Sequence, residues 1–359
     1  MITAKFGGTA ITPFNLHFVK ACLTPAHNAV VVSAIGKEYP SDVKATDLLK
    51  RFYLTRSDAL WTALSSKYRR LVEVNGVNVD VDELLFDAYT RATQFDLSYC
   101  MSLGEELSAK IVAKYLSADY IEAEQIVRFG SRRLRLNDTL QNIASAFKGV
   151  ELAVTGGFYG GGLCSRSVFS RGGSDITGSL CAVGTGACLY ENWTDSYGVC
   201  VADPVKVADV STVNSLCYDE MFFLAKSGAE VLHPDAVKPC KEHGVPIKIG
   251  NFYNPYGAST LVSNCRSKEK ILSLTERADE NGNVVTTVLH NLEPSVIAAV
   301  LADFLRGNSS AFSAFGKSYP SEKVAVLSFT CKNNLAAVTT NKSVISDFYK
   351  CLKSLNLVH

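Results

Sequence analysis

Short apolar runs alternate with longer amphipathic stretches along the first two thirds of the chain. Residues 1–6 and 28–33 are apolar runs that predict buried strands. Between them, apolar positions in residues 13–23 recur with helical spacing and predict an amphipathic helix that begins at Pro13. Strand, turn, helix and strand in this order indicate an α/β sheet, in which ligands bind at the carboxyl ends of the strands.

Helical periodicity then continues from residue 46 to about residue 116, with breaks expected near residues 75–80 and before Ser102. Glu105 and Glu106 therefore fall in the predicted first turn of a helix, where either carboxylate alone would simply complement the helix dipole. Later strands are predicted at residues 152–155, 187–195 and 245–249, and a short strand or hairpin arm at residues 199–203. Later helices are predicted at residues 174–188, at residues 218–226 and from Pro234 onward.

A charged and polar stretch at residues 263–270 predicts a boundary between a domain of residues 1–265 and one of residues 266–359. The second segment has its own predicted elements: strands at residues 284–290, 311–315 and 324–329, and helices at residues 294–305 and 343–355. This order matches most of a βαββαβ ferredoxin-like unit, with its last strand reduced to the final residues. We expect an α/β sandwich followed by a smaller α+β domain.

Glycine turns follow the predicted strands and gather polar side chains there. In the turn Phe169-Ser-Arg-Gly-Gly-Ser-Asp-Ile-Thr177, a glycine pair precedes a helix expected to begin at Ser174. Free amides at a helix N-terminus, with Arg171 beside them, would bind a phosphate or a carboxylate. An ordinary strand-to-helix loop with Ser174 as N-cap is the alternative. A second glycine pair, Gly7-Gly8, directly after the first strand favours the anion site.

Composition restricts the class of protein. Lys+Arg (36) and Asp+Glu (35) nearly cancel, so no net field draws the chain to nucleic acid or to a membrane surface. No apolar stretch approaches the ~20 residues of a membrane-spanning helix, and the N-terminus lacks a signal-peptide layout. Eleven cysteines without a Cys-x-x-Cys pair argue against a disulfide framework and a zinc site. We expect a cytoplasmic protein with free thiols.

The chemistry available at the strand ends suits phosphoryl transfer. Walker-type, dinucleotide-binding and Gly-x-Ser-x-Gly motifs are all absent from the sequence. What remains is a set of backbone amides, Lys5, Arg171 and several carboxylates, and Lys5 is either a solvated strand end or a placed cation. Such groups position a nucleotide carrying Mg²⁺ and offset its charge, with carboxylates contacting the metal directly or through water.

Eight ordered motifs give the chain a specific resemblance, because together they are similar to those of the aspartate kinases (aspartokinases) of the amino acid kinase family. The motifs are Lys5-Phe-Gly-Gly-Thr9, Val31-Val-Ser-Ala34, Thr46-Asp-Leu-Leu49, Gly104-Glu105, Gly172-Gly-Ser-Asp175, Trp193-Thr-Asp195, Ala202-Asp-Pro204 and Val231-Leu-His-Pro234. They cover residues 1 to about 263, whereas the segment beyond resembles the family only by an ACT-like pattern of elements.

The resemblance implies transfer of the γ-phosphoryl group of ATP, with Mg²⁺, to the side-chain carboxylate of L-aspartate. The products would be 4-phospho-L-aspartate and ADP, in the biosynthesis of amino acids such as lysine and threonine. A carboxylate nucleophile, with a reference pKa of about 3.9, is already ionised at neutral pH and needs no general base.

The family roles carry over to matching positions as expectations. Lys5 would stabilise the transferring phosphoryl group, and Asp175 would orient Lys5 or the substrate ammonium. Arg171 would bind the α-carboxylate of aspartate, and Glu105 its α-amino group. Hydroxyl side chains would complete the aspartate site: Ser33, Thr46 and Ser174. With Lys5, three turns would line the nucleotide site: Gly7, Gly8, Thr9, Thr194, Asp195 and Asp203. His233 is expected to be a structural residue before Pro234.

Two departures from the family pattern concern the nucleotide site. Where many aspartokinases have a lysine and an arginine, this chain has Glu230 and Val205. The exchange should weaken ATP binding unless Lys206 or Lys226 substitutes, so Glu230→Lys is expected to lower the KM for ATP. An unchanged or larger KM would contradict this expectation.

The C-terminal segment has room for about one ACT unit, whereas aspartokinases usually carry two that bind lysine or threonine. Its turn at residues 290–294 lacks the glycine that effector sites often use. We therefore expect weak or absent feedback inhibition and a homodimer formed through this segment.

Two other functions stay open at this point. A non-catalytic paralogue would bind nucleotide or amino acid and regulate a partner, which Glu230 and Val205 favour and the retained Lys5 and Asp175 oppose. A related kinase would phosphorylate glutamate, N-acetylglutamate, carbamate or a nucleotide monophosphate. The pairing of Glu105 with Arg171 favours a free α-amino acid, because carbamate and nucleotides have no ammonium group.

Overall fold

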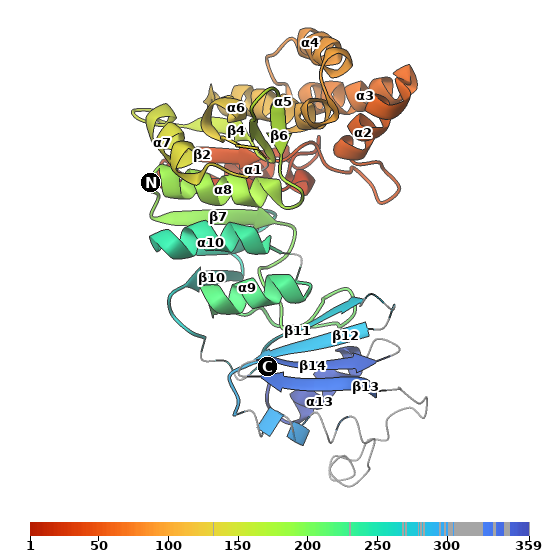
Figure 1. Ribbon diagram of the computed structural model, residues 1–359, viewed down its shortest axis with the longest axis vertical. Coiled ribbons are helices and arrows are strands. Elements are labelled where there is room, and N and C mark those ends of the chain that lie inside the picture. Colours follow the sequence, from red (N-terminus) through yellow and green to blue (C-terminus); the bar gives the residue numbers. More distant parts are fainter. Residues whose placement is uncertain are drawn as a thin grey trace. The chain divides into compact units, whose positions relative to one another are not determined.

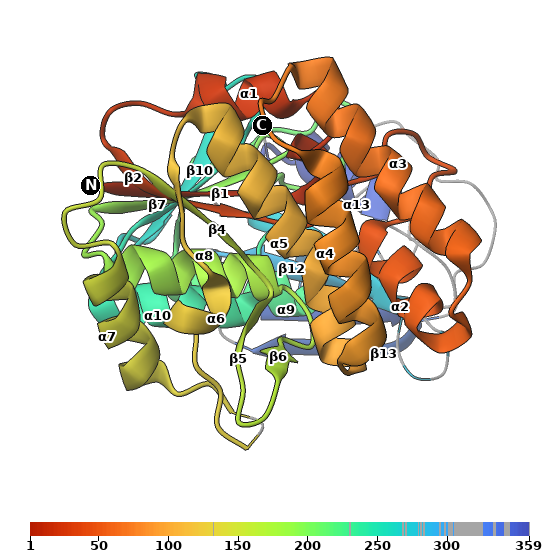
Figure 2. The ribbon, with the colours of Figure 1, turned by 90° about the horizontal axis from the view of Figure 1, so that it is seen from above.

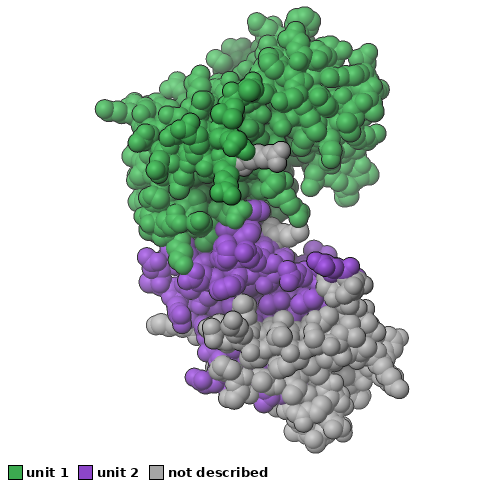
Figure 3. Space-filling view, in the orientation of Figure 1, with its two compact units in different colours: residues 1–196, 235–257 green, residues 197–234, 258–359 purple. Residues whose placement is uncertain are grey.

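The computed structural model describes two compact units of the chain (Figure 3), one of residues 1–196 and 235–257 and one of residues 197–234 and 258–359. The described residues are 1–131, 133–229, 231–267, 269, 271–278, 280, 282, 284–293, 296, 297, 299, 300, 304, 326–332, 335–340 and 345–358. Of residues 326–332 and 335–340 only the backbone is described. Within these ranges no helix is both long and apolar enough to cross a membrane.

The first unit contains a parallel sheet whose strands run in the order β3-β4-β2-β1-β7-β9. Its strands are β1 (Ile2–Phe6), β2 (His27–Val32), β3 (Asp119–Tyr120), β4 (Ala153–Gly156), β7 (Leu189–Thr194) and β9 (Ile247–Asn251). Every residue of β2 and β4 is buried, so apolar residues follow one another in them, at residues 29–32 and 153–154, instead of alternating with exposed polar ones. The predicted α/β fold is confirmed.

Helices cover this sheet, and two of them matter for the site: α5 (Leu97–Leu116) packs on β4, and α8 (Gly173–Gly184) packs on β1 and β2 (Figure 2). The other helices of the unit are α1 (Leu16–Cys22), α2 (Ala45–Thr55), α3 (Asp58–Asn75), α4 (Val81–Gln94), α6 (Ala123–Ile126), α7 (Leu136–Ala146) and α10 (Pro234–His243). A small antiparallel hairpin joins β5 (Tyr159–Gly161) to β6 (Arg166–Val168). It lies beside α5 in both ribbon views (Figures 1 and 2).

The helical region from residue 46 to 116 is confirmed, but the break expected before Ser102 is wrong. The chain breaks at Phe95 instead, because the Asp96 side chain accepts a hydrogen bond from the Tyr99 amide and caps α5. Glu105 and Glu106 therefore lie in the middle of a continuous helix, far from its N-terminal dipole. The helix expected from Ser174 begins at Gly173, with Gly172 as N-cap at a φ of 61°, so Ser174 is not the cap.

In the second unit, a parallel pair, β8 (Ser215–Cys217) and β10 (Ser259–Ser263), accompanies α9 (Tyr218–Ser227). A four-stranded antiparallel sheet has the order β11-β12-β14-β13. Its strands are β11 (Ile271–Ala278), β12 (Val284–His290), β13 (Val326–Lys332) and β14 (Leu335–Thr340), and helix α13 (Ile345–Ser354) follows.

Several predictions for this unit need correction. Residues 199–203 form no strand of a sheet, but they begin the hairpin arm that was the other expectation. Cys200 bridges antiparallel to Thr212, and the amide of Val201 donates to the carbonyl of Ser211 at 3.0 Å. The sequence did not predict β8, β10, β11 or β14; β11 directly follows the charged stretch taken for a link, and it pairs along the edge of β12. The strand expected at residues 311–315 and most of the helix expected at residues 294–305 lie outside the described residues, as does Glu230.

Candidate active site

The turns after β1 and β2 touch each other through backbone alone. A Cβ added to Gly8 would lie 3.0 Å from the carbonyl oxygen of Ala34, and a Cβ on Gly36 would overlap the carbonyl oxygen of Gly8. Ser33, the first residue after β2, donates its amide to the carbonyl of Phe6 at 3.2 Å. The carboxyl ends of the two strands are thereby held together, with Ser33 between them.

Lys5 and Asp175 form an ion pair across β1 and α8, with 2.6 Å between Nζ and Oδ1. Lys5 is only 8% exposed. Of the two interpretations of Lys5, a solvated strand end or a placed cation, the structure therefore supports the placed cation. Its ammonium also lies along the glycine turn, because a Cβ added to Gly7 would be 3.7 Å from Nζ. A fixed positive charge thus stands beside the turn that follows β1.

Ser174 reaches the same strand ends from the first turn of α8. A Cβ added to Gly157 would lie 2.7 Å from the Ser174 hydroxyl oxygen, so the glycine is required for this approach. The amide of Gly157 donates to the carbonyl of Val32 at 2.9 Å, which places the turn after β4 against the end of β2. The sequence marks this segment as a glycine turn, Gly156-Gly157, but does not reveal the contact with Ser174.

Glu105 approaches from α5 and is 4% exposed. Its Oε2 has no hydrogen-bond partner among the described residues. Burial raises the pKa of this carboxyl to about 8, although the backbone amide of Ala34 acts in the opposite direction as a hydrogen-bond donor. A buried carboxyl without a cation is a strong acceptor for a ligand that brings its own positive charge.

Arg171 and Thr46 are less closely engaged. Arg171 is exposed on the turn before Gly172, and no ion pair is formed by it within the described part of the chain. Thr46 is half-buried in the first turn of α2, and its side chain makes no hydrogen bond to the other predicted site residues that are described. The structure thus joins Lys5, Ser33, Ser174 and Asp175 closely, while Arg171 is free to meet an anion.

Most of the residues predicted to line the nucleotide site lie at the ends of β1 and β7. The amide of Gly7 donates to the carbonyl of Trp193 at 3.3 Å, whereas the amide of Gly8 has no acceptor in the described ranges. The Thr194 hydroxyl donates to Asp195 at 3.2 Å, and Asn251 donates to the carbonyl of Asp195 at 3.1 Å. The carbonyl of Thr9 accepts from Asn15 at 2.8 Å. Trp193 and Asn251 support this edge, and the sequence analysis had given neither a role.

Asp203 belongs to the second unit, where its Oδ1 accepts the amide of Val205 at 2.9 Å. Val205 itself is 92% exposed. Of the two lysines considered as substitutes for missing cations, Lys206 pairs with the buried Glu276 at 2.9 Å. The other, Lys226, stands 4.5 Å from the centre of the Phe222 ring. The ammonium of Lys206 is therefore already engaged within its own unit.

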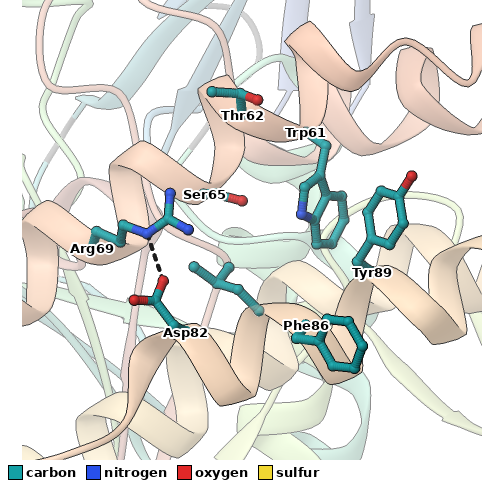
Figure 4. A pocket seen from close by; sticks show the side chains of 8 residues that line it. Trp61, Thr62, Ser65, Arg69, Asp82, Phe86 and Tyr89 are labelled. Carbon is teal, nitrogen blue, oxygen red and sulfur yellow. Dashed lines mark hydrogen bonds and ion pairs between the residues drawn. The ribbon is translucent and has the colours of Figure 1, made fainter.

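An open pocket of about 480 Å³ lies elsewhere, between α3 and α4 (Figure 4). Aromatic side chains of Trp61, Phe86 and Tyr89 form one wall, and the exposed ion pair of Arg69 and Asp82 forms another. The pocket contains none of the predicted site residues.

Comparisons with known proteins agree with this geometry. The model of the amino acid kinase family matches residues 1–251. Aspartokinase 3 of Bacillus subtilis is 31% identical over 312 residues, which are 79% of this chain and 66% of the relative. The aspartokinase of Chlamydia muridarum is 28% identical over 278 residues, 70% of this chain and 61% of the relative. The chain thus spans slightly less than two thirds of the length of these relatives.

Solved structures show the same similarity. The aspartate kinase of Clostridium acetobutylicum superposes with a TM-score of 0.73 at 25% identity, covering 99% of this chain and 81% of that one. E. coli aspartokinase III, solved with aspartate and ADP, has the same fold, with a TM-score of 0.68 at 21% identity over 100% of this chain and 84% of that one. With a buried lysine–aspartate pair at glycine-lined strand ends and a family model matching residues 1–251, the chain belongs to the amino acid kinase family, and within it resembles the aspartokinases.

Proposed function

We propose that the protein is an aspartate kinase, which transfers the γ-phosphoryl group of MgATP to the side-chain carboxylate of L-aspartate. The observation that carries the proposal is the Lys5–Asp175 ion pair beside the glycine turn after β1. The same unit also contains the buried carboxyl of Glu105, whose Oε2 has no hydrogen-bond partner among the described residues. The aspartokinase relatives and the E. coli aspartokinase III structure with aspartate and ADP support the choice of substrates.

Aspartate would be bound by its two charged α-substituents. Glu105 accepts the α-ammonium group, which supplies the positive charge that its buried carboxylate lacks. Arg171 presents a planar fork to the α-carboxylate. Hydroxyl groups complete the site: Ser33, Thr46 and Ser174. Recognition of both α-groups restricts the acceptor to a free amino acid.

In the transfer step the side-chain carboxylate of aspartate, which is ionised at neutral pH, forms a bond to the γ-phosphorus. The bond from that phosphorus to the β,γ-bridging oxygen breaks, and ADP leaves with its electron pair. Lys5 offsets the negative charge that develops on the transferring group, and Asp175 holds the lysine in place. The amide of Gly8 and the N-terminus of α8 add further donors. Mg²⁺ bound to the nucleotide would neutralise its phosphates. The residues at the ends of β1 and β7 that would line this site are Gly7, Thr9, Thr194 and Asp195.

We further propose that residues 1–265 form the catalytic domain and that residues 266–359 form an ACT-like domain. The sheet of β11, β12, β14 and β13, with α13 after it, supports this assignment. Two copies would associate through this domain, and feedback inhibition by lysine or threonine would be weak or absent. The reaction would serve amino-acid biosynthesis in the cytoplasm.

The activity is tested by incubating the protein with MgATP, L-aspartate and hydroxylamine, which traps an acyl phosphate as a hydroxamate. Lys5→Met should lower the rate about 100-fold or more, because a preorganised charge at the transferring group is lost. Lys20→Met, at an exposed lysine of α1, is the matched control and should leave the rate unchanged.

Hydroxamate from glutamate but not from aspartate would instead indicate a kinase for another acid. No hydroxamate, together with saturable binding of ATP or an amino acid, would indicate a non-catalytic paralogue. Either result would overturn the proposal.

A further inference from the structure

Next to Glu105 on α5, the carboxylate of Glu106 is surrounded by cations. Arg91 of α4 binds both of its oxygens, at 2.8 and 2.9 Å. Lys110 lies 2.6 Å from Oε1, and Arg166 of β6 lies 2.6 Å from Oε2. The side chain of Glu106 is 1% exposed. This cluster of Glu106, Arg91, Lys110 and Arg166 takes no part in the proposed chemistry. Its function must therefore be a different one.

Arg166 is the member of the cluster with the most partners. Besides Glu106, its guanidinium contacts Ser102 of α5 at 3.1 Å, Glu122 at 3.3 Å and Glu124 of α6 at 2.5 Å. It also stacks 4.3 Å from the ring centre of Tyr99 and 4.7 Å from that of Tyr159. Buried ion clusters of this kind add little stability compared with well-packed apolar residues, but they fix one geometry of the groups around them.

The geometry that Arg166 fixes is that of the hairpin leading to the aspartate site. Arg166 begins β6, which runs directly into the turn containing Arg171. Its partner strand β5 follows the turn that touches Ser174, and the amide of Phe169 donates to the carbonyl of Phe158 at 2.9 Å. The other end of the cluster is α5, in which Glu106 directly follows Glu105. Figure 2 shows β6 and α5 side by side.

We propose that Arg166 is a positioning residue of the aspartate site, which sets the distance between Glu105 on α5 and the Arg171 turn after β6. The inference rests on the proposed function. The α-ammonium and α-carboxylate of an amino acid are attached to one carbon, so the groups that bind them must be held at a fixed separation. A misplacement of about 1 Å can cost an enzyme about 100-fold in rate, so such a separation has to be held closely.

Arg91 provides a matched control. It binds the same carboxylate of Glu106 with two hydrogen bonds, and its other ion-pair partner is Asp87 on its own helix. Its described partners do not include any residue of the β5–β6 hairpin. Methionine at either position removes one cation from Glu106, but only Arg166→Met also releases the hairpin.

The kinetic test compares the two variants in the full chain. Arg166→Met should raise the KM for aspartate about tenfold or more and leave the KM for MgATP within about twofold. Arg166→Lys should restore part of the loss. Arg91→Met should leave the KM for aspartate within about twofold, although it also lowers the unfolding midpoint. Equal changes of this KM in both methionine variants, or a change in kcat alone, would overturn the proposal.

A second measurement does not depend on the reaction. Amide hydrogen exchange of residues 169–175, without substrate, should be faster in Arg166→Met than in the wild type and in Arg91→Met. Should Arg166→Met fail to fold, Glu124→Gln removes one of its outer partners and should accelerate the same amides to a smaller extent. Unchanged exchange would refute the positioning role even in an active kinase. Faster exchange in a protein that forms no hydroxamate would support it while the proposed function fails.

Discussion

Glu105 and Glu106 are neighbours on α5, and both side chains are buried, yet their surroundings shift the pKa values of the two carboxyls in opposite directions. Burial raises the pKa of Glu105 to about 8, because no cation offsets the loss of water. Burial alone would also raise the pKa of Glu106, but hydrogen bonds from Arg91 and the charges of Arg166 and Lys110 outweigh it and lower the pKa to about 2. The Oε2 atom of Glu105 can still accept a hydrogen bond from a ligand, whereas both oxygens of Glu106 are already bound by cations of the protein.

The difference shows how one helix can carry a ligand-binding residue and a structural residue side by side. Successive residues point about 100° apart around a helix, so Glu105 faces the strand ends while Glu106 faces the hairpin. The chemical type of the residue does not decide its task. The number of opposite charges within hydrogen-bonding distance does.

The largest expected effect comes from removing the carboxylate that the cations surround. Glu106→Gln should lower the free energy of unfolding by about 3–5 kcal/mol, because Arg91, Arg166 and Lys110 are left buried or half-buried without their shared counter-charge. Urea denaturation at pH 7 measures this loss. A decrease below about 1 kcal/mol would mean that the cluster contributes nothing specific.

The neighbouring substitution should act on binding instead of stability. Glu105→Gln should lower kcat/KM for aspartate about 100-fold, because the α-ammonium loses a buried counter-charge. Its free energy of unfolding at pH 8 should be unchanged or higher, since the variant no longer buries an ionisable group. Steady-state kinetics and denaturation on the same preparation separate the two effects. A large loss of stability with normal kinetics would reverse the assignment of the two glutamates.

The contributions of Glu105 and Glu106 to the free energy of unfolding should also depend on pH in opposite directions. Glu105 has a folded pKa of about 8, above its ordinary value of 4.5, so the folded state holds a proton that the unfolded state releases. Its contribution to stability is complete below pH 4.5 and is lost as the pH rises to 8, by up to about 1.4 kcal/mol per pH unit. Glu106, with a folded pKa of about 2, contributes above pH 4.5 and loses its contribution as the pH falls to 2.

Denaturation curves collected from pH 5 to pH 8 test the first of these slopes. The decline of stability with rising pH should be smaller in Glu105→Gln than in the wild type. Identical slopes would show that Glu105 is not protonated in the unliganded protein.

The smallest effect is expected where an ion pair is exposed. Arg69 and Asp82 are 2.7 Å apart at the pocket of Figure 4, but their side chains are 51% and 70% exposed. Arg69→Ala should change the free energy of unfolding by less than about 1 kcal/mol, because water solvates both charges once they separate. A thermal melt beside that of Glu106→Gln makes the contrast direct. A loss comparable to that of Glu106→Gln would show that burial does not explain the difference.

The sequence predicted the parts of the molecule that depend on neighbours along the chain. The strand before Gly7, the glycine turn before Ser174 and the helical region after residue 46 are all local patterns. The prediction failed before Ser102, where a break was expected and α5 runs on without one. Gly104 in fact lies inside α5, where an added Cβ would be 2.9 Å from the Cβ of Ala34. The glycine serves packing between distant segments, which no local pattern reveals.

The candidate site divides in the same way. Lys5 and Asp175 could be named from their turns, but their ion pair at 2.6 Å depends on how α8 packs on β1. The hydrogen-bond and ion-pair partners of Arg166 lie 42 to 64 residues away in the chain, so its role could not be predicted from spacing. The different surroundings of Glu105 and Glu106 are likewise a product of the folded helix. The sequence allowed single site residues to be predicted, but not which of them contact one another.

The contact between Gly8 and Gly36 has a consequence for how this protein can diverge. Backbone meets backbone there, and a side chain at Gly36 would force the two turns apart, because its Cβ would overlap the carbonyl oxygen of Gly8. Position 36 is therefore closed to any side chain, even that of alanine, unless the backbone shifts, and position 8 leaves little room for one. A related protein that phosphorylates a different acceptor molecule would have to keep this turn and change the residues around it.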